Sequence, residues 1–305
     1  MSNKNKTALF RADSSSIIGT GHIMRDLVLA TKYAKKGYQV IFATQNLSGN
    51  INHKIKEQNL QIIILKSNSK KELVKLINTL NIDLLVIDHY EINYKKEKYI
   101  KDKTNIKILS FDDTYEKHNC DILYNHNISA NKKRYKTLVP RNCKLKCGSK
   151  YTLLRDEFKK YKNKKYKPNK KFTFFIAMGG ADTSNLNINI LKVLKEFKNI
   201  KINLVTTTAN KNLNVLKKYC KDKKYINLYI NSNKIAKLIS KSDFGIITPS
   251  VSANELIYMK LVFIAIKTAS NQKDIYNYLE VNNYLVLKKY DTIILKSYIK
   301  RLLNE

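Results

Sequence analysis

Residues 7–30 read TALFRADSSSIIGTGHIMRDLVLA and combine a short apolar run, a loop with two glycines and an amphipathic stretch. The apolar run TALFR predicts a buried strand. Ile23, Leu27 and Ala30 recur at helical spacing, so the residues after the loop predict a helix. Strand, glycine loop and helix together are the repeating unit of an α/β sheet, and this stretch therefore predicts an α/β fold.

The same alternation of apolar runs and helix-length amphipathic stretches continues along the chain. The further expected strands lie at 38–44, 61–65, 83–89, 106–111, 121–125, 172–178, 202–208, 226–230, 244–250, 261–266 and 283–288. Residues 292–305 predict a closing helix. The pattern is typical of two Rossmann-like domains, each a parallel sheet with helices on both faces, with a ligand cleft between them. We expect an N-terminal domain at 1–158, a lysine-rich linker at 159–171 and a C-terminal nucleotide-binding domain at 172–305.

The charge of the chain raises the alternative of a nucleic-acid-binding protein. Its 58 Lys and Arg residues outnumber 24 Asp and Glu, leaving a formal charge of +34. Clustered cations favour nucleic acid because they neutralise phosphates. The lysines are spread over most of the chain, however, and the one dense run, KKYKNKKYKPNKK at 159–171, reads best as a linker. No RNA- or DNA-binding signature accompanies it, so we expect no nucleic-acid partner.

Four scattered cysteines are too few for a disulfide framework in 305 residues, and we expect reduced thiols. The first ten residues, MSNKNKTALF, do not resemble a signal peptide, and no apolar run is long enough to span a membrane. These features predict a soluble cytoplasmic protein without a membrane partner.

The glycine loop of residues 11–22 is the first candidate site. Gly19 and Gly21 would let a ligand approach the backbone, and Thr20 is a candidate helix N-cap. His22 falls in the first turn of the helix, where the dipole disfavours its cation, so it is a candidate base near neutral pH. The alternative is that His22 caps the turn and the glycines serve packing.

Two loops in the second half are candidate phosphate sites. AMGGADTSN (177–185) follows an expected strand, but it has neither the spacing of a dinucleotide fold nor that of a P-loop. ITPSVSANELIYM (247–259) places Ser250 and Ser252 at a helix start, whose N–H groups suit a pyrophosphate, and Glu255 one turn further on could accept from a ribose diol. Taken singly, a tight turn and a solvated glutamate explain these residues as well.

Polar residues also gather after the expected strands at 83–89 and 106–111. Asp88, His89, Asp112 and Asp113 are chemically able to bind a metal, but their spacing matches no known ligand pattern. Ordinary hydrogen bonding at strand ends explains them better. With His118, His126 and Asn127, they predict the rim of a cleft.

Several motifs together resemble one enzyme family. RADSSSIIGTGHIMRDLVLA, LLVIDHYE, ILSFDD, CDILYN, CGSKYTLLRDEF, FFIAMGGADTSN and NEL followed by ASNQ occur in this order from about Leu9 to Tyr284. In order and spacing they are similar to the UDP-sugar hydrolases of pseudaminic acid biosynthesis.

The resemblance implies a two-domain glycosyltransferase-B-type fold that uses water as the acceptor. The substrate would be UDP-2,4-diacetamido-2,4,6-trideoxy-β-L-altropyranose, cleaved at the anomeric C–O bond with inversion and without metal or cofactor. It places catalytic roles on His22, Tyr90 and Asn271, and Asp13 is a candidate to orient His22 or the water. The expected substrate-binding residues are Arg11, Gly19, Gly21, Arg155, Gly179, Gly180, Ser250, Val251, Ser252 and Glu255. We expect a monomer with this one activity; the alternative within the fold is a glycosyltransferase with a UDP-sugar donor.

Overall fold

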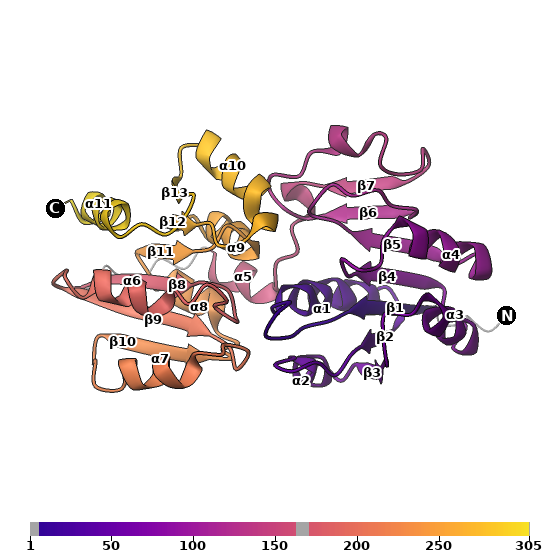
Figure 1. The fold of residues 1–305 in the computed structure, drawn as a ribbon, viewed down its shortest axis with the longest axis horizontal. Helices are drawn as coiled ribbons and strands as arrows, with labels where there is room; N and C mark the ends of the chain where they lie inside the picture. Colours follow the sequence, from indigo (N-terminus) through magenta and orange to yellow (C-terminus); the bar gives the residue numbers. More distant parts are fainter. Residues whose placement is uncertain (1–5, 163–170, 305) are drawn as a thin grey trace. The chain divides into compact units, whose positions relative to one another are not determined.

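The computed structural model describes residues 6–162 and 171–304 and divides into two units, Met1–Leu153 and Leu154–Glu305 (Figure 1). The division precedes the expected domain end at 158, because α5 (Asp156–Tyr161) packs against helices of the second unit. Of the expected linker at 159–171, residues 159–161 belong to α5 and 163–170 lie outside the described residues.

The N-terminal unit contains a seven-stranded sheet in the order β3-β2-β1-β4-β5-β6-β7, with every neighbouring pair parallel. The strands are β1 (Thr7–Ala12), β2 (Gln39–Thr44), β3 (Gln61–Ile64), β4 (Leu84–Asp88), β5 (Lys107–Phe111), β6 (Ile122–Asn125) and β7 (Lys144–Cys147). The parallel α/β architecture predicted for this half is thereby confirmed.

The edge strand β7 is absent from the sequence prediction. Its residues alternate, with Leu145 and Cys147 packed into the core and Lys144 and Lys146 on the opposite face. A four-residue strand at a sheet edge, with two lysines, has no continuous apolar run, and this composition is typical of protected edges.

Helices cover both faces of this sheet. One core cluster includes Ile23 and Leu27 of α1 (Gly21–Ala34) and Ile55 of α2 (Asn52–Lys56). A second cluster, on the other face, includes residues of α3 (Lys70–Thr79) and α4 (Tyr94–Thr104). Full burial of a side chain such as Leu27 is worth about 1.5–3 kcal/mol, so the apolar stripe of α1 fixes that helix against the strands. The short helices η1 (Lys132–Tyr135) and η2 (Ser149–Tyr151) flank β7.

The C-terminal unit contains a six-stranded parallel sheet in the order β10-β9-β8-β11-β12-β13. The strands are β8 (Phe172–Ala177), β9 (Ile200–Thr206), β10 (Ile226–Ile230), β11 (Phe244–Ile247), β12 (Val262–Ile266) and β13 (Leu285–Leu287). The helices are α6 (Asn187–Leu194), α7 (Leu213–Cys220), α8 (Ile235–Ser240), α9 (Val251–Met259), η3 (Ser270–Gln272), α10 (Lys273–Val281) and α11 (Thr292–Leu303).

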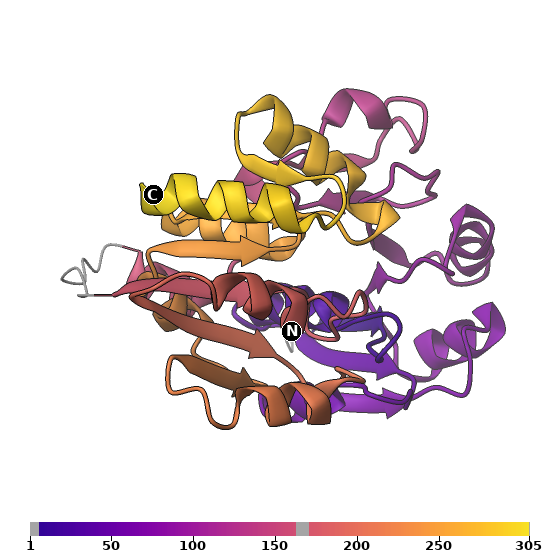
Figure 2. The same cartoon turned by 60° about the vertical axis from the view of Figure 1, so that its left-hand side comes forward.

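The predicted closing helix is α11, drawn in yellow in Figure 2. It packs with α6 over the core of this unit, and its first N–H groups, those of Ile293 and Ile294, are capped by the Asp291 carboxylate at 2.9 Å.

Both sheets reverse strand order at their centre, between β1 and β4 in one unit and between β8 and β11 in the other. Ligands of open α/β sheets bind beyond the carboxyl ends of the strands at such switch points. The candidate loops after β1, β4, β8 and β11 therefore lie where this fold binds ligands. Within the described ranges, no helix has the length and apolar character required to cross a bilayer.

Candidate active site

The loop between β1 and α1 forms a tight turn, and its two glycines have open space around them. Ser15 and Gly19 exchange backbone hydrogen bonds of 3.3 and 2.9 Å, and Gly19 has a φ of +85°, which favours glycine. A Cβ added at Gly19 or Gly21 would meet no heavy atom within 4 Å. Packing within the described chain thus gives no reason for glycine at position 21, which has no positive φ either.

His22 lies in the first turn of α1, as predicted, and its side chain is buried. Burial lowers the pKa of the imidazole, while the negative charge of Asp88 opposes the shift. The sequence prediction attributed the neutral form to the helix dipole, whereas desolvation is the larger cause. Nδ1 lies 3.9 Å from Oδ1 of Asp88 and has no hydrogen-bond partner among the described residues. A neutral His22 with Nδ1 turned toward Asp88 can accept a proton at Nε2.

Arg25 connects α1 to the ends of two strands. Its Nε and Nη2 each donate to the Asp88 carboxylate at 2.5 Å, and its Nη1 donates to Oδ2 of Asp113 at 3.3 Å. Burial alone would raise the pKa of Asp88, but the charge of Arg25 outweighs it and lowers that pKa to about 2. The guanidinium also lies 5.0 Å from the centre of the Phe111 ring. Sequence reasoning missed Arg25, although its place one turn after His22 puts both on the same side of the helix.

Asp26 and His126 are two further buried titratable groups near this ion pair. Burial and the negative charge of Asp88 raise the pKa of Asp26 well above its ordinary value. Burial, aided by the charge of Arg25, lowers the pKa of His126 to about 3. Burial thus favours the uncharged form of both groups, whereas Arg25 and Asp88 pair as opposite charges beside His22.

Asp13 belongs to a second buried network. Arg11 binds it with two hydrogen bonds of 2.8 and 2.6 Å, and Gln45 N donates to it at 2.7 Å. His89 donates from Nε2 at 3.1 Å, with its Nδ1 accepting from Glu91 N, which fixes the tautomer. Burial would raise the pKa of Asp13, but the bonds from His89 and Arg11 hold it well below its usual range.

This network changes how Arg11 and Asp13 are understood. The sequence prediction placed Arg11 among the substrate-binding residues, yet its side chain is fully buried and also bonds Ala43 O and Asn68 Oδ1. The prediction that Asp13 orients His22 has no counterpart among its hydrogen bonds, and the carboxylate that approaches His22 is that of Asp88.

Tyr90 is a half-exposed residue that follows β4. Its ring meets the His22 ring edge-on, with centroids 5.1 Å apart, and its hydroxyl donates to Oδ1 of Asp113 at 3.0 Å. The structure thus brings two of the predicted catalytic residues, His22 and Tyr90, into direct contact. His118 does not join them, because it pairs with Glu97 of α4 at 2.8 Å.

In the C-terminal unit, hydrogen bonds hold the loop after β8 at Gly180, while Gly179 in the same loop is exposed. Gly180 O accepts from Thr207 N at 2.9 Å and from both threonine hydroxyls of residues 206 and 207. Gly179 is exposed, has a φ of +81° and would meet nothing within 4 Å with a Cβ. Asp182 accepts from the N–H groups of Leu186 and Asn187 at the start of α6, and burial raises its pKa to about 6.

The loop after β11 lies beside it. Ala177 and Ile247 are register partners, and Thr248 N donates to Ala177 O at 3.4 Å. Ser250 is the N-cap residue of α9 but makes no side-chain cap bond; its hydroxyl lies 3.1 Å from that of Thr248. The N–H groups of Val251 and Ser252, in the first turn of α9, have no intrahelical acceptor. The glycine loop and the helix start thus lie at the same edge of the sheet, and a helix start is a place where backbone N–H groups can donate to an anion.

Glu255 and Arg155 form an ion pair within this unit. Arg155 Nη2 lies 3.3 Å from Oε1 of Glu255, and Nη1 lies 2.8 Å from Oε1 of Glu157. Burial raises the pKa of Glu255, and the charge of Arg155 opposes it. Arg155, predicted to bind substrate, is thus placed to hold Glu255 on α9.

Asn271 lies in η3, at the same carboxyl edge of the sheet, and is exposed. The neighbouring Gln272 shapes this turn, since its Oε1 accepts from Thr268 N at 2.8 Å and from Ala269 N at 3.3 Å. The predicted residues therefore form two sets, one within each unit.

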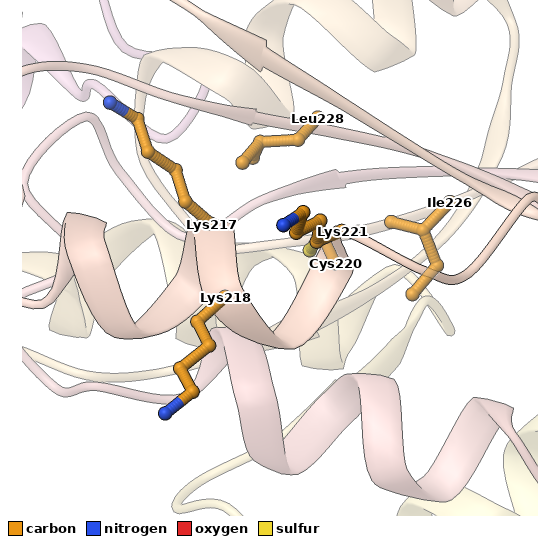
Figure 3. Close-up of a pocket in the computed structure, with 6 residues that line it drawn as sticks. All are labelled: Lys217, Lys218, Cys220, Lys221, Ile226 and Leu228. Atoms are coloured by element: carbon orange, nitrogen blue, oxygen red, sulfur yellow. The ribbon is translucent and has the colours of Figure 1, made fainter.

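A pocket of about 410 Å³ lies elsewhere, between α7 and the edge strand β10 (Figure 3). It is lined by Lys217, Lys218, Cys220, Lys221, Ile226 and Leu228. None of these lining residues is a histidine or a carboxylate, and none is among the predicted site residues. Across the residues that the structure describes, no group of three or more His, Cys, Asp or Glu side chains is arranged to hold a metal ion.

Solved structures of low sequence identity share the fold of this chain. A crystal structure of Acinetobacter baumannii MurG superposes with a TM-score of 0.63 at 13% identity, covering 98% of this chain and 91% of that one. The spinosyn rhamnosyltransferase SpnG gives 0.69 at 8% identity, covering 98% and 92%. These similarities and the two parallel sheets confirm the predicted glycosyltransferase-B-type fold.

Two proteins are similar to this chain in sequence over most of its length. No family model matches the chain. An uncharacterized protein of Methanocaldococcus jannaschii is 28% identical over 277 residues, 87% of this chain and 56% of that protein. The UDP-2,4-diacetamido-2,4,6-trideoxy-beta-L-altropyranose hydrolase of Campylobacter jejuni is 43% identical over 282 residues, 92% of this chain and 99% of that enzyme. This chain therefore belongs to the family of UDP-2,4-diacetamido-2,4,6-trideoxy-β-L-altropyranose hydrolases.

Proposed function

We propose that this protein hydrolyses UDP-2,4-diacetamido-2,4,6-trideoxy-β-L-altropyranose to UDP and the free sugar. Family membership supports the substrate, and the observation that carries the chemistry is the buried, neutral His22 beside the Arg25–Asp88 ion pair. A base for water must be unprotonated near the working pH, and burial gives His22 that property.

In the proposed reaction a water oxygen forms a bond to the anomeric carbon from the face opposite UDP. The bond from that carbon to the diphosphate oxygen breaks, and its electron pair leaves with UDP, so the anomeric configuration inverts. The proton lost by the water moves to Nε2 of His22. Asp88, 3.9 Å from Nδ1, then stabilises the imidazolium that forms.

The C-terminal unit supplies the UDP-binding groups in this proposal. The N–H groups at Val251 and Ser252 and the loop at Gly179 and Gly180 donate to the diphosphate, so that backbone dipoles rather than a metal disperse its charge. Glu255, held by Arg155, accepts from the ribose hydroxyls.

The remaining assignments follow the family resemblance. Tyr90 and Asn271 contact the acetamido or hydroxyl groups of the sugar. The enzyme acts as a cytoplasmic monomer in pseudaminic acid biosynthesis and needs no cofactor.

The test is to incubate the purified protein with the UDP-sugar, with and without EDTA, and to follow the sugar by NMR. A free reducing sugar that first appears with inverted anomeric configuration supports hydrolysis, whereas a glycoside on an added acceptor supports the glycosyltransferase alternative. His22→Ala should lower kcat by about 10²- to 10⁴-fold, the range for loss of a general base, and should still bind UDP. His53→Ala, at an exposed histidine of α2, is the matched control. Full activity of His22→Ala would overturn the proposed mechanism.

A further inference from the structure

The Tyr90 hydroxyl is fixed by a neighbouring carboxylate. It lies 3.0 Å from Oδ1 and 3.3 Å from Oδ2 of Asp113. In both contacts the phenol is the donor and a carboxylate oxygen the acceptor, so the phenolic proton points at Asp113. The phenol oxygen retains lone pairs, and toward a ligand it therefore acts as an acceptor.

Asp113 is itself held in place. Arg25 Nη1 donates to its Oδ2 at 3.3 Å, and the same guanidinium is fixed by its two bonds to Asp88. Only 14% of the Asp113 side chain is exposed, whereas 52% of Tyr90 is exposed. The chain Asp88–Arg25–Asp113 thus orients the hydroxyl of a half-exposed tyrosine.

The Tyr90 ring meets the His22 ring edge-on at 5.1 Å, so the oriented hydroxyl belongs to the same small region as the base. A water molecule that attacks carbon has two protons, and a single base accepts only one of them. A hydrogen-bond acceptor for the second O–H fixes the orientation of the water and directs an oxygen lone pair toward the anomeric carbon.

We propose that Asp113 is a positioning residue. It orients the Tyr90 hydroxyl so that its oxygen accepts a hydrogen bond from the second O–H of the attacking water, and in this proposal the hydroxyl contacts the water rather than the sugar. The inference rests on the proposed hydrolysis but adds Asp113, a residue to which the family resemblance assigns no role. Asp113 touches neither water nor sugar in this proposal and acts only through Tyr90.

A double-mutant cycle tests whether Asp113 acts through Tyr90. Asp113→Ala and Tyr90→Phe should each lower kcat by about tenfold, the equivalent of one hydrogen bond of about 1.4 kcal/mol, with little change in KM. The double variant should be no slower than Tyr90→Phe, because the carboxylate has nothing left to orient. Asp113→Asn should keep kcat within about threefold of wild type, since its amide oxygen still accepts from the phenol.

Controls separate positioning from folding. Asp102→Ala, at an exposed residue of α4, should leave kcat unchanged, and thermal melting should show that the Asp113 variants are folded. An equal loss from Asp113→Ala in the wild-type and Tyr90→Phe backgrounds would overturn the proposal, as would a change confined to KM.

An activity-independent measurement distinguishes this inference from the proposed function. In protein labelled with ¹³Cζ-tyrosine, the Tyr90 resonance is assigned by its loss in Tyr90→Phe. It should shift in Asp113→Ala and stay near its wild-type position in Asp113→Asn. An unmoved resonance contradicts the inference while leaving hydrolysis intact, and a shifted resonance in a wild-type protein that releases no UDP contradicts the proposed function instead.

Discussion

The two units share a strand order that reverses at the sheet centre, but they place different chemistry at that point. In the N-terminal unit, charged side chains form buried ion pairs, Arg11 with Asp13 and Arg25 with Asp88. In the C-terminal unit the same position carries exposed glycine, hydroxyl groups and helix N–H groups, together with the ion pairs of Arg155 with Glu157 and Glu255.

This difference separates two physical tasks. Burial shifts the pKa of His22 and Asp26 because it removes water from the charged form, and a proton-transfer site needs such shifts. Backbone donors bind an anion without becoming charged themselves, which suits a leaving group that must be released. A buried ion pair costs desolvation energy, so the Arg25–Asp88 pair is better explained by its place beside His22 than by stability.

The largest effect is expected from breaking that buried pair. Arg25→Met leaves Asp88 charged and unpaired and should lower the free energy of unfolding by about 3–5 kcal/mol. Urea denaturation measures the change. Adding Asp88→Asn removes the stranded charge and should restore much of the loss.

The exposed pair between Lys98 and Asp102 on α4 is the control, and Lys98→Ala should leave the urea midpoint unchanged. A small effect from Arg25→Met would show that the N-terminal unit tolerates free charge, and the contrast between the units would fail.

The next effect concerns ribose recognition in the C-terminal unit. Glu255→Ala should weaken UDP binding by about 10- to 100-fold, the equivalent of hydrogen bonds to a charged group. Calorimetry with UDP and 2′-deoxy-UDP measures it, because the wild type should discriminate between the two and the variant should not. Glu196→Ala, at an exposed residue that pairs with Lys296, is the matched control.

Most of the fold follows from the sequence because its strands are continuous apolar runs. LLVID and VFIAI are buried on both faces of a parallel sheet, and this burial requires such composition. The edge strand KLKC was missed because one of its faces needs no apolar residue. The expected domain end at 158 falls inside α5, because the lysines of this helix continue into the lysine-rich run of the sequence.

The candidate site was harder to predict because its pairs are distant in sequence. His22 was found through its glycine loop, a local signal. Arg25 and Asp88 are separated by 63 positions and meet only because β1 lies beside β4. The cause of the His22 pKa shift depends on burial, which no local pattern around residue 22 reveals.

Two glycines of the N-terminal unit distinguish ligand approach from backbone strain. Gly21 has an ordinary φ and open space around it, so Gly21→Ala should leave stability unchanged and lower kcat/KM by about tenfold if substrate passes there. Gly37, after α1, has a φ of +83°, and Gly37→Ala should lower stability by about 1 kcal/mol without affecting turnover. Paired urea and kinetic measurements test both. Equal activity of Gly21→Ala and wild type would favour the packing interpretation of the loop.

The smallest expected effects are shifts of stability with pH, which should have opposite signs in the two units. The pKa of His126 is lowered to about 3 from 6.5, so between these values the unfolded chain binds a proton that the native state does not. Acidification from pH 7.5 to 5 therefore destabilises the N-terminal unit through His126, and His126→Asn should reduce that loss.

The pKa of Asp182 is raised to about 6 from 3.8, so between these values the native state binds a proton that the unfolded chain does not. Acidification stabilises the C-terminal unit through Asp182, and Asp182→Asn should increase the net loss. Melting midpoints at pH 7.5 and 5 should move by a few degrees in these opposite directions. If His126→Asn and Asp182→Asn changed the acid-induced shift of the melting midpoint in the same direction, burial would act alike on the titratable groups of the two units, and the contrast would fail.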